Sequence, residues 1–149
     1  MPKILLFAPC QKAIINQDDK SVSLISVISG LTIAPPDTEA SPINPNTFAP
    51  IAWSAVSVWV KTPDDDAETV FEQRLDVFGP KGGEILTSAE TPFKMTHRTH
   101  QIAMNGALFP IGIPGEYNLV LSFRVLGAEE WREVARYPVE ITHVVPASE

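Results

Sequence analysis

The stretch PGEYNLVLSFRV, residues 114–125, decides the fold class of this chain. Apolar side chains occupy alternate positions from Tyr117 to Val125, and most of the residues between them are polar. A period of two places one set of side chains on a single face of a strand. The Pro-Gly pair in front of it is typical of a turn. The stretch therefore predicts a β-strand with one buried face, entered through a turn.

Similar runs of β-branched and aromatic residues recur along the whole chain, separated by Pro and Gly, with Pro9 expected to break the first two apart. They occupy residues 4–7, 13–15, 21–33, 54–60, 68–78, 84–86, 98–109 and 131–142. About eight strands at this spacing are typical of an antiparallel two-sheet β-sandwich. We therefore predict an all-β chain in which residues 1–149 form one domain.

One segment also fits a helix. Residues 128–136 contain good helix formers, with Trp131, Val134 and Ala135 at helical spacing. Residues 137–142 follow at once with the composition of a strand, and would complete a hairpin with the strand before them. We favour the hairpin.

The first half of the chain contains two unusual segments. Residues 21–33 carry apolar side chains on both faces, which predicts either a central strand covered twice or a strand that changes sheet at Gly30. Residues 34–50 contain five prolines, which exclude a helix and leave little room for a paired strand. We predict a long surface loop that crosses between the sheets. Docking of a partner by this loop in extended form is the alternative to a plain connector.

Composition limits the classes of partner. The 149-residue chain has a formal net charge of −7 and a pI near 4.9. Its 11 Lys and Arg residues are scattered, which argues against a nucleic-acid surface. Anionic lipid would repel an acidic protein unless a metal bridged the two. We expect neither nucleic acid nor a membrane as the partner.

The single cysteine bears on the compartment. Cys10 has no second cysteine to pair with, and a lone thiol is normal in a reducing compartment. The apolar residues 4–8 are fewer than the roughly 7–15 of an export signal, and Pro9 occupies the cleavage position. No run approaches the roughly 20 apolar residues of a membrane span. We therefore expect a cytoplasmic protein.

Two histidines are candidates for a metal site. A spacing of three on a strand sends His97 and His100 to opposite faces, which prevents them from binding one ion. No Cys or carboxylate lies near them at ligand spacing. We interpret both as surface or edge histidines.

An acidic run offers a second candidate. Asp64-Asp65-Asp66, with Asp18-Asp19, could bind calcium at one end of the sandwich, as loop aspartates do in calcium-dependent phospholipid-binding sandwiches. Neighbouring aspartates cannot all point inward, so an acidic turn that keeps a loop solvated is the favoured interpretation. We predict no metal site.

No pattern points to catalysis. Cys10 has no nucleophile signature around it and is interpreted as a buried thiol. No Gly-x-Ser-x-Gly elbow occurs. Residues 79–83, GPKGG, lack the spacing of a phosphate-binding loop and predict a hairpin turn. We predict no catalytic residue and no cofactor.

Two tryptophans raise the question of a partner surface. Trp53 and Trp59 are in the same alternation phase, so both side chains lie on one face of their strand. Packing in the core between the sheets is the favoured interpretation. An exposed aromatic platform for a partner or a sugar is the alternative.

Pro114-Gly115-Glu116-Tyr117 resembles the tyrosine corner of immunoglobulin-like sandwiches. The resemblance implies that Tyr117 lies early in the penultimate strand and bonds to the backbone between Phe109 and Ile113. The disulfide pair of antibody domains is absent, so the resemblance is to the wider superfold.

The layout of the whole chain also resembles a bacterial family of uncharacterised proteins, a domain of unknown function. The matching features are Pro9-Cys10, Asp18-Asp19, Ser23-Leu24-Ile25, the strand from Trp53 to Trp59, the turn at 79–83, and His97-Arg98 ahead of Pro114-Gly115-Glu116-Tyr117. This resemblance implies a sandwich fold and carries no activity with it.

The sequence therefore predicts a non-catalytic β-sandwich that binds or assembles with a protein partner, as an accessory part of a bacterial or phage-borne system. The alternative is calcium-dependent binding of a membrane surface through Asp64, Asp65 and Asp66. An enzyme would need a polar cleft that holds Arg98 and His100.

Overall fold

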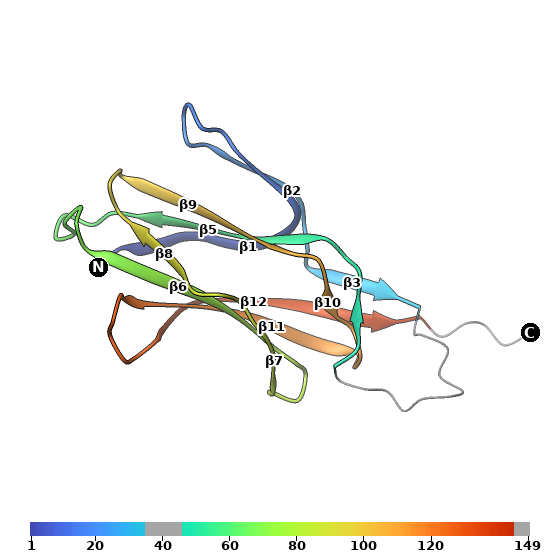
Figure 1. The fold of residues 1–149 in the computed structure, drawn as a ribbon. Helices are drawn as coiled ribbons and strands as arrows, with labels where there is room; N and C mark the ends of the chain where they lie inside the picture. Colours follow the sequence, from blue (N-terminus) through green and yellow to red (C-terminus); the bar gives the residue numbers. More distant parts are fainter. Residues whose placement is uncertain (35–45, 145–149) are drawn as a thin grey trace, which may run out of the picture.

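The computed structural model describes residues 1–34 and 46–144, and within these ranges the chain forms strands and no helix (Figure 1). The strands are β1 (Lys3–Ile15), β2 (Val22–Val27), β3 (Gly30–Ile33), β4 (Phe48–Ala49), β5 (Trp53–Val60), β6 (Val70–Phe78), β7 (Glu84–Thr87), β8 (Thr91–Lys94), β9 (Thr99–Gly106), β10 (Phe109–Pro110), β11 (Gly115–Val125) and β12 (Arg132–His143). The all-β prediction is confirmed. The expected count of about eight was wrong, because the runs at 21–33 and 98–109 each form two strands and because β4 and β8 were not predicted.

Two larger sheets pack face to face in a sandwich-like arrangement (Figure 1). The first sheet has the order β2-β1-β5-β9. The second has the order β3-β12-β11-β6-β7, with β8 also paired to β6. β4 and β10 form a small separate sheet. The prediction of a purely antiparallel arrangement was wrong, since β3 lies parallel to β12.

The run at 21–33 changes sheet. β2 belongs to the first sheet and β3 to the second, and the chain crosses between them at Ile28 and Ser29. The amide of Ile28 donates to the carbonyl of Pro9 at 2.9 Å, while the carbonyl of Ser29 accepts from the amide of Glu140 at 3.1 Å. Each of the two residues is thus bonded to a different sheet. The sheet-change alternative is confirmed.

β1 runs unbroken through Pro9, so the expected break was wrong. Residues up to Cys10 pair with β5, and from Cys10 onward the strand pairs with β2. Pro9 has no amide hydrogen, but its carbonyl still accepts the bond from Ile28. The strand continues because each half has its own neighbour.

The core between the sheets contains two aromatic groups. Trp53 lies edge-on to Phe109 at 5.3 Å between ring centroids, and Trp59 stacks on Phe93 at 5.2 Å. The side chains of Trp53 and Trp59 are 3% and 0% exposed. Core packing of both tryptophans is confirmed, and the exposed-platform alternative was wrong, because the face of β5 that carries them points at the second sheet.

A polar residue bridges the sheets inside this core. Oε1 of Gln73, on β6, accepts hydrogen bonds from Oγ of Ser57 and Nε1 of Trp59, both at 2.8 Å. Gln73 and Ser57 are fully buried. Since buried donors are costly when unpaired, this amide fixes the position of Trp59 and of β6 relative to β5.

Two carboxylates on the outer face of β6 are buried, although alternate polar residues on a strand usually face water. Glu72 and Asp76 are each only 3% exposed. Glu72 pairs with Arg124 at 3.2 Å and Asp76 with Arg74 at 3.1 Å. The ring of Trp131 covers both arginines, with guanidinium carbons 4.2 and 4.5 Å from its centroid. The charges are therefore shielded from water by an aromatic ring from outside the strand.

The last two long strands form the predicted hairpin. β11 and β12 pair from Gly115–Ile141 to Phe123–Arg132, so the helix alternative for 128–136 was wrong. The turn at 79–83 is also as predicted: the amide of Gly82 donates to the carbonyl of Gly79, and φ of Gly82 is +82°. Eleven of the residues expected in the proline-rich loop, 35–45, lie outside the described residues.

Candidate functional site

The hairpin of β1 and β2 extends beyond the body of the sandwich (Figure 1). Its turn is closed by bonds between Asn16 and Ser21 and between Lys20 and Asn16, each 2.9 Å. Oδ1 of Asp19 accepts from the amide of Ser21, also at 2.9 Å. These local bonds give the hairpin a defined tip.

One face of this hairpin covers the outside of the first sheet. Cys10, Val56 and Val58 are buried there, against a set of partly buried apolar residues: Ala13, Val22, Leu24 and Ala103. Val56 and Val58 are on the opposite side of β5 from the core tryptophans. The hairpin is therefore anchored by a third apolar cluster of its own.

The other face of the hairpin is open and carries mostly aliphatic side chains, with the exposed Lys12 opposite Ile25. Ile14, Ile25 and Val27 are 46%, 44% and 48% exposed. β2 is the terminal strand of the first sheet, bonded only to β1 among the residues that the structure describes. Its six residues, VSLISV, include no charge and no proline. Proteins usually protect such an edge with charges, prolines or a covering segment.

We name this surface, the free side of β2 with Ile14, Ile25 and Val27, the β2 edge. Ser26 within it has φ of +55°, in the left-handed region that few non-glycine residues adopt. The sequence signal was present in the apolar residues on both faces of 21–33. That pattern predicted either a central strand covered on both faces or a strand that changes sheet. Neither prediction includes an open edge, so the β2 edge was missed.

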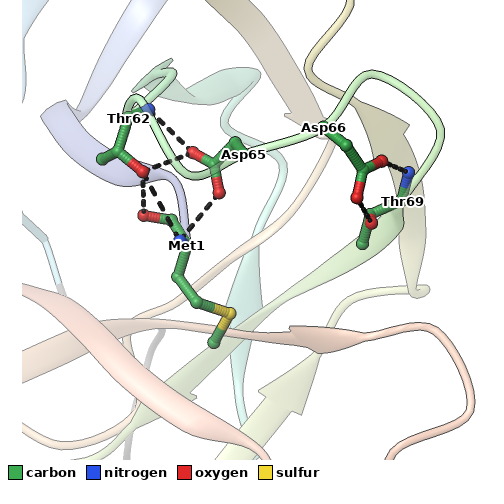
Figure 2. Close-up of polar contacts among 5 residues, drawn as sticks. All are labelled: Met1, Thr62, Asp65, Asp66 and Thr69. Atoms are coloured by element: carbon green, nitrogen blue, oxygen red, sulfur yellow. Dashed lines mark hydrogen bonds and ion pairs between the residues drawn. The ribbon is translucent and has the colours of Figure 1, made fainter.

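The acidic run does not converge on one point. Oδ2 of Asp65 accepts from the amide and hydroxyl of Thr62 at 2.7 and 2.8 Å, and Oδ1 pairs with the terminal ammonium of Met1 at 2.7 Å (Figure 2). Asp66 accepts separately from the amide and hydroxyl of Thr69 at 2.6 and 2.7 Å. Asp64 is exposed. Both carboxylates therefore stabilise the loop between β5 and β6 through hydrogen bonds, and Asp65 also joins this loop to Met1.

The pKa directions agree with this structural role. Burial acts to raise the pKa of Asp65, but the bonds from the Met1 ammonium and Thr62 outweigh it and leave the pKa lowered. Hydrogen bonds from Thr69 lower the pKa of Asp66, and those from Ser21 lower the pKa of Asp19. No group of three or more His, Cys, Asp or Glu suited to a metal ion occurs in the described ranges.

The two histidines lie in different surroundings. His97 is exposed, whereas the ring of His100 stacks on Phe93 at 5.4 Å. Burial, and then the nearby charge of His97, lower the pKa of His100. His97 and Arg98 line a shallow hollow with Lys61, and His100 is not part of it. The polar cleft that would hold Arg98 and His100 together is therefore not formed there.

The tyrosine corner forms as the resemblance implied. Tyr117 is fully buried near the start of β11, the penultimate strand. Its hydroxyl donates to the carbonyl of Ile113 at 2.8 Å and accepts from the amide of Ile113 at 3.1 Å. Gly115 between them has φ of +136°, and a side chain there would press on Pro80 at 3.0 Å. Pro114 is exposed at the turn.

The thiol of Cys10 packs in the buried apolar cluster with Val56 and Val58. Cys10 is fully buried beneath the hairpin, and burial raises the pKa of its thiol. A raised pKa leaves little of the thiolate that nucleophilic chemistry requires.

No family model and no curated protein matches this chain. No helix of membrane-spanning length and apolar character occurs in residues 1–34 and 46–144.

Proposed function

We propose that this chain is a non-catalytic binding or assembly module, and that the β2 edge is the surface that holds its partner. The partner contributes an extended, largely apolar segment that adds to the first sheet as a further strand. Backbone bonds along an open edge supply affinity in this mode, and side chains on alternate positions supply specificity. The observation that carries the proposal is an uncharged edge strand with two half-exposed aliphatic residues, Ile25 and Val27, and a third, Ile14, on the neighbouring strand.

The remaining surface supports binding through this edge in preference to others. The second sheet ends at β3 on one side and at β7 and β8 on the other, and all three have only four residues. β9, at the far edge of the first sheet, carries His100, Gln101 and Asn105. Among the edge strands of the described ranges, β2 is the one that combines more than four residues, no charge and half-exposed aliphatic side chains, Ile25 and Val27.

The same chain features support proposals on its fold family, its biological system and its cellular location. We propose that the sandwich is immunoglobulin-like, which the corner at Tyr117 and Ile113 supports. We also propose a place in a bacterial or phage-borne system, on the resemblance of the whole chain, and a cytoplasmic location, on the unpaired Cys10. Calcium-dependent membrane binding is not proposed, because Asp65 and Asp66 bond to groups of their own loop.

The experiment is capture of partners from the native host with three forms of the tagged chain. Ile25→Lys places a charge on the β2 edge without touching the buried cluster. Leu126→Lys is the matched control, since Leu126 is also a half-exposed aliphatic residue but lies in the turn between β11 and β12. We expect one host protein to be retained by the parent chain and by Leu126→Lys, and lost with Ile25→Lys. Equal retention by all three forms, or none by the parent chain, would contradict the proposal.

A further inference from the structure

A small apolar cleft opens at the side of the sandwich, away from the β2 edge. It lies between the last residues of β9 and the break that separates β7 from β8, and has a volume of about 350 Å³. This is within the size range of small-molecule sites. Trp53 and Leu75 are its buried lining residues and form the floor.

The floor of the cleft is fixed in place. Nε1 of Trp53 donates to the carbonyl of Leu108 at 2.8 Å, and Phe109 packs edge-on against the indole. Gly106 lies against the same indole, and a Cβ there would overlap the ring. The absence of a side chain at 106 is therefore what allows Trp53 to form the floor, and the cleft exists before any ligand arrives.

The lining is uncharged throughout. Its apolar part includes Leu86, Met104 and Leu108, and Leu108 at the rim is 50% exposed. Its polar side chains already have partners within the chain. The hydroxyl of Ser88 accepts from the amide of Leu75, and the hydroxyl of Thr87 donates to Asp76 and Glu84. Oδ1 of Asn105 accepts from Ser54.

From this geometry we propose that the cleft binds a small, uncharged and mainly apolar molecule, of about two fused rings in size. A cavity of roughly 150 Å³ takes up benzene, so about 350 Å³ accommodates the larger group. A carboxylate or phosphate is disfavoured, because no cationic side chain lines the cleft to offset the loss of water. The proposal is independent of the β2 edge and stands or fails separately.

The test uses 2-naphthol as the probe, followed by the indole and backbone N–H signals in nitrogen-15 correlation spectra of the intact chain. We expect saturable shifts of the Trp53 indole and of amides in 86–89 and 104–108, with a Kd below about 1 mM. The indoles of Trp59 and Trp131 should not move, because neither lines the cleft. The charged analogue 2-naphthoate should bind at least about tenfold more weakly.

Two variants locate the site. Ala89 is an exposed lining residue, so Ala89→Trp fills the mouth of the cleft and should weaken 2-naphthol binding by about tenfold or more. Ala128→Trp places the same side chain on an exposed turn elsewhere and should leave binding unchanged. If Ala89→Trp does not fold, Leu108→Ala removes the rim and should weaken binding several-fold. Shifts that do not saturate, or equal binding by the parent chain and the folded cleft variant, would overturn the proposal.

Discussion

The hydroxyl of Tyr117 bonds to both backbone groups of Ile113, donating to the carbonyl at 2.8 Å and accepting from the amide at 3.1 Å. The side chain of Tyr117 is fully buried, and Ile113 is partly buried. This contact ties the loop before β11 to the core.

Tyr117→Phe keeps the ring and removes only these two bonds. We expect the free energy of unfolding to fall by about 1–3 kcal/mol, the usual result when a buried group loses its partner. Urea unfolding of the two proteins measures the change. A loss smaller than about 0.3 kcal/mol would show that the corner does not stabilise this fold. Tyr137→Phe, on a half-buried tyrosine of β12, is the matched control and should have the smaller effect.

The buried amide of Gln73 leads to a second prediction. Gln73→Leu should lower the free energy of unfolding by about 2–5 kcal/mol, because it leaves the hydroxyl of Ser57 and the indole N–H of Trp59 without a partner. Ser57→Ala removes one donor and leaves the Trp59 bond intact, so it should cost about 1 kcal/mol. Equal losses for the two variants in urea unfolding would argue against the bridge.

The pairing of Asp65 predicts a pH dependence. Its side chain is 2% exposed and its pKa is lowered in the folded chain, so its stabilising effect is complete above the unfolded pKa of about 3.8. The effect is lost as the pH falls through the lower folded pKa. Asp65→Asn should therefore be less stable than the parent chain at pH 6 by roughly 1–2 kcal/mol, and the difference should shrink below about pH 4.

Asp64→Asn is the matched control, since it changes an exposed neighbour in the same run. We expect no change in its stability between pH 3 and pH 6 relative to the parent chain, beyond about 0.5 kcal/mol. Urea unfolding at both values checks the pair. A difference for Asp65→Asn that grows as the pH falls would contradict the direction of its pKa.

Metal addition tests the acidic run directly. An ion bound to the folded chain at a hundredfold excess over its Kd would stabilise it by about 2.7 kcal/mol. Because Asp65 and Asp66 bond to protein groups, we expect millimolar calcium and micromolar zinc to leave the melting temperature unchanged. A rise of several degrees with calcium that Asp65→Ala with Asp66→Ala abolished would restore the membrane-binding alternative.

Alternation and turn chemistry predicted the local elements of this chain well. The period of two in residues 117–125 gave β11 and its buried face, and GPKGG gave the turn before β7. The phase shared by Trp53 and Trp59 placed both correctly on the core side of β5. In each case the information lies within a few neighbouring residues.

Features that depend on which segments meet in space could not be predicted in this way. Glu72 and Asp76 are buried because Trp131, more than fifty residues away along the chain, covers their arginine partners. The β2 edge is open because of the order of strands in the first sheet, which no local pattern encodes. The cleft likewise combines residues 86–89 with 104–108.

The most direct test of the proposed function is hydrogen exchange along Val22–Val27, measured with and without the captured partner. A strand added to the β2 edge gives bonds to alternate amides that face outward in the free chain. We predict that exchange at these alternate amides slows by at least about tenfold on binding, while exchange in β9 at the far edge stays the same. Unchanged exchange throughout Val22–Val27 in a saturated complex would contradict the account.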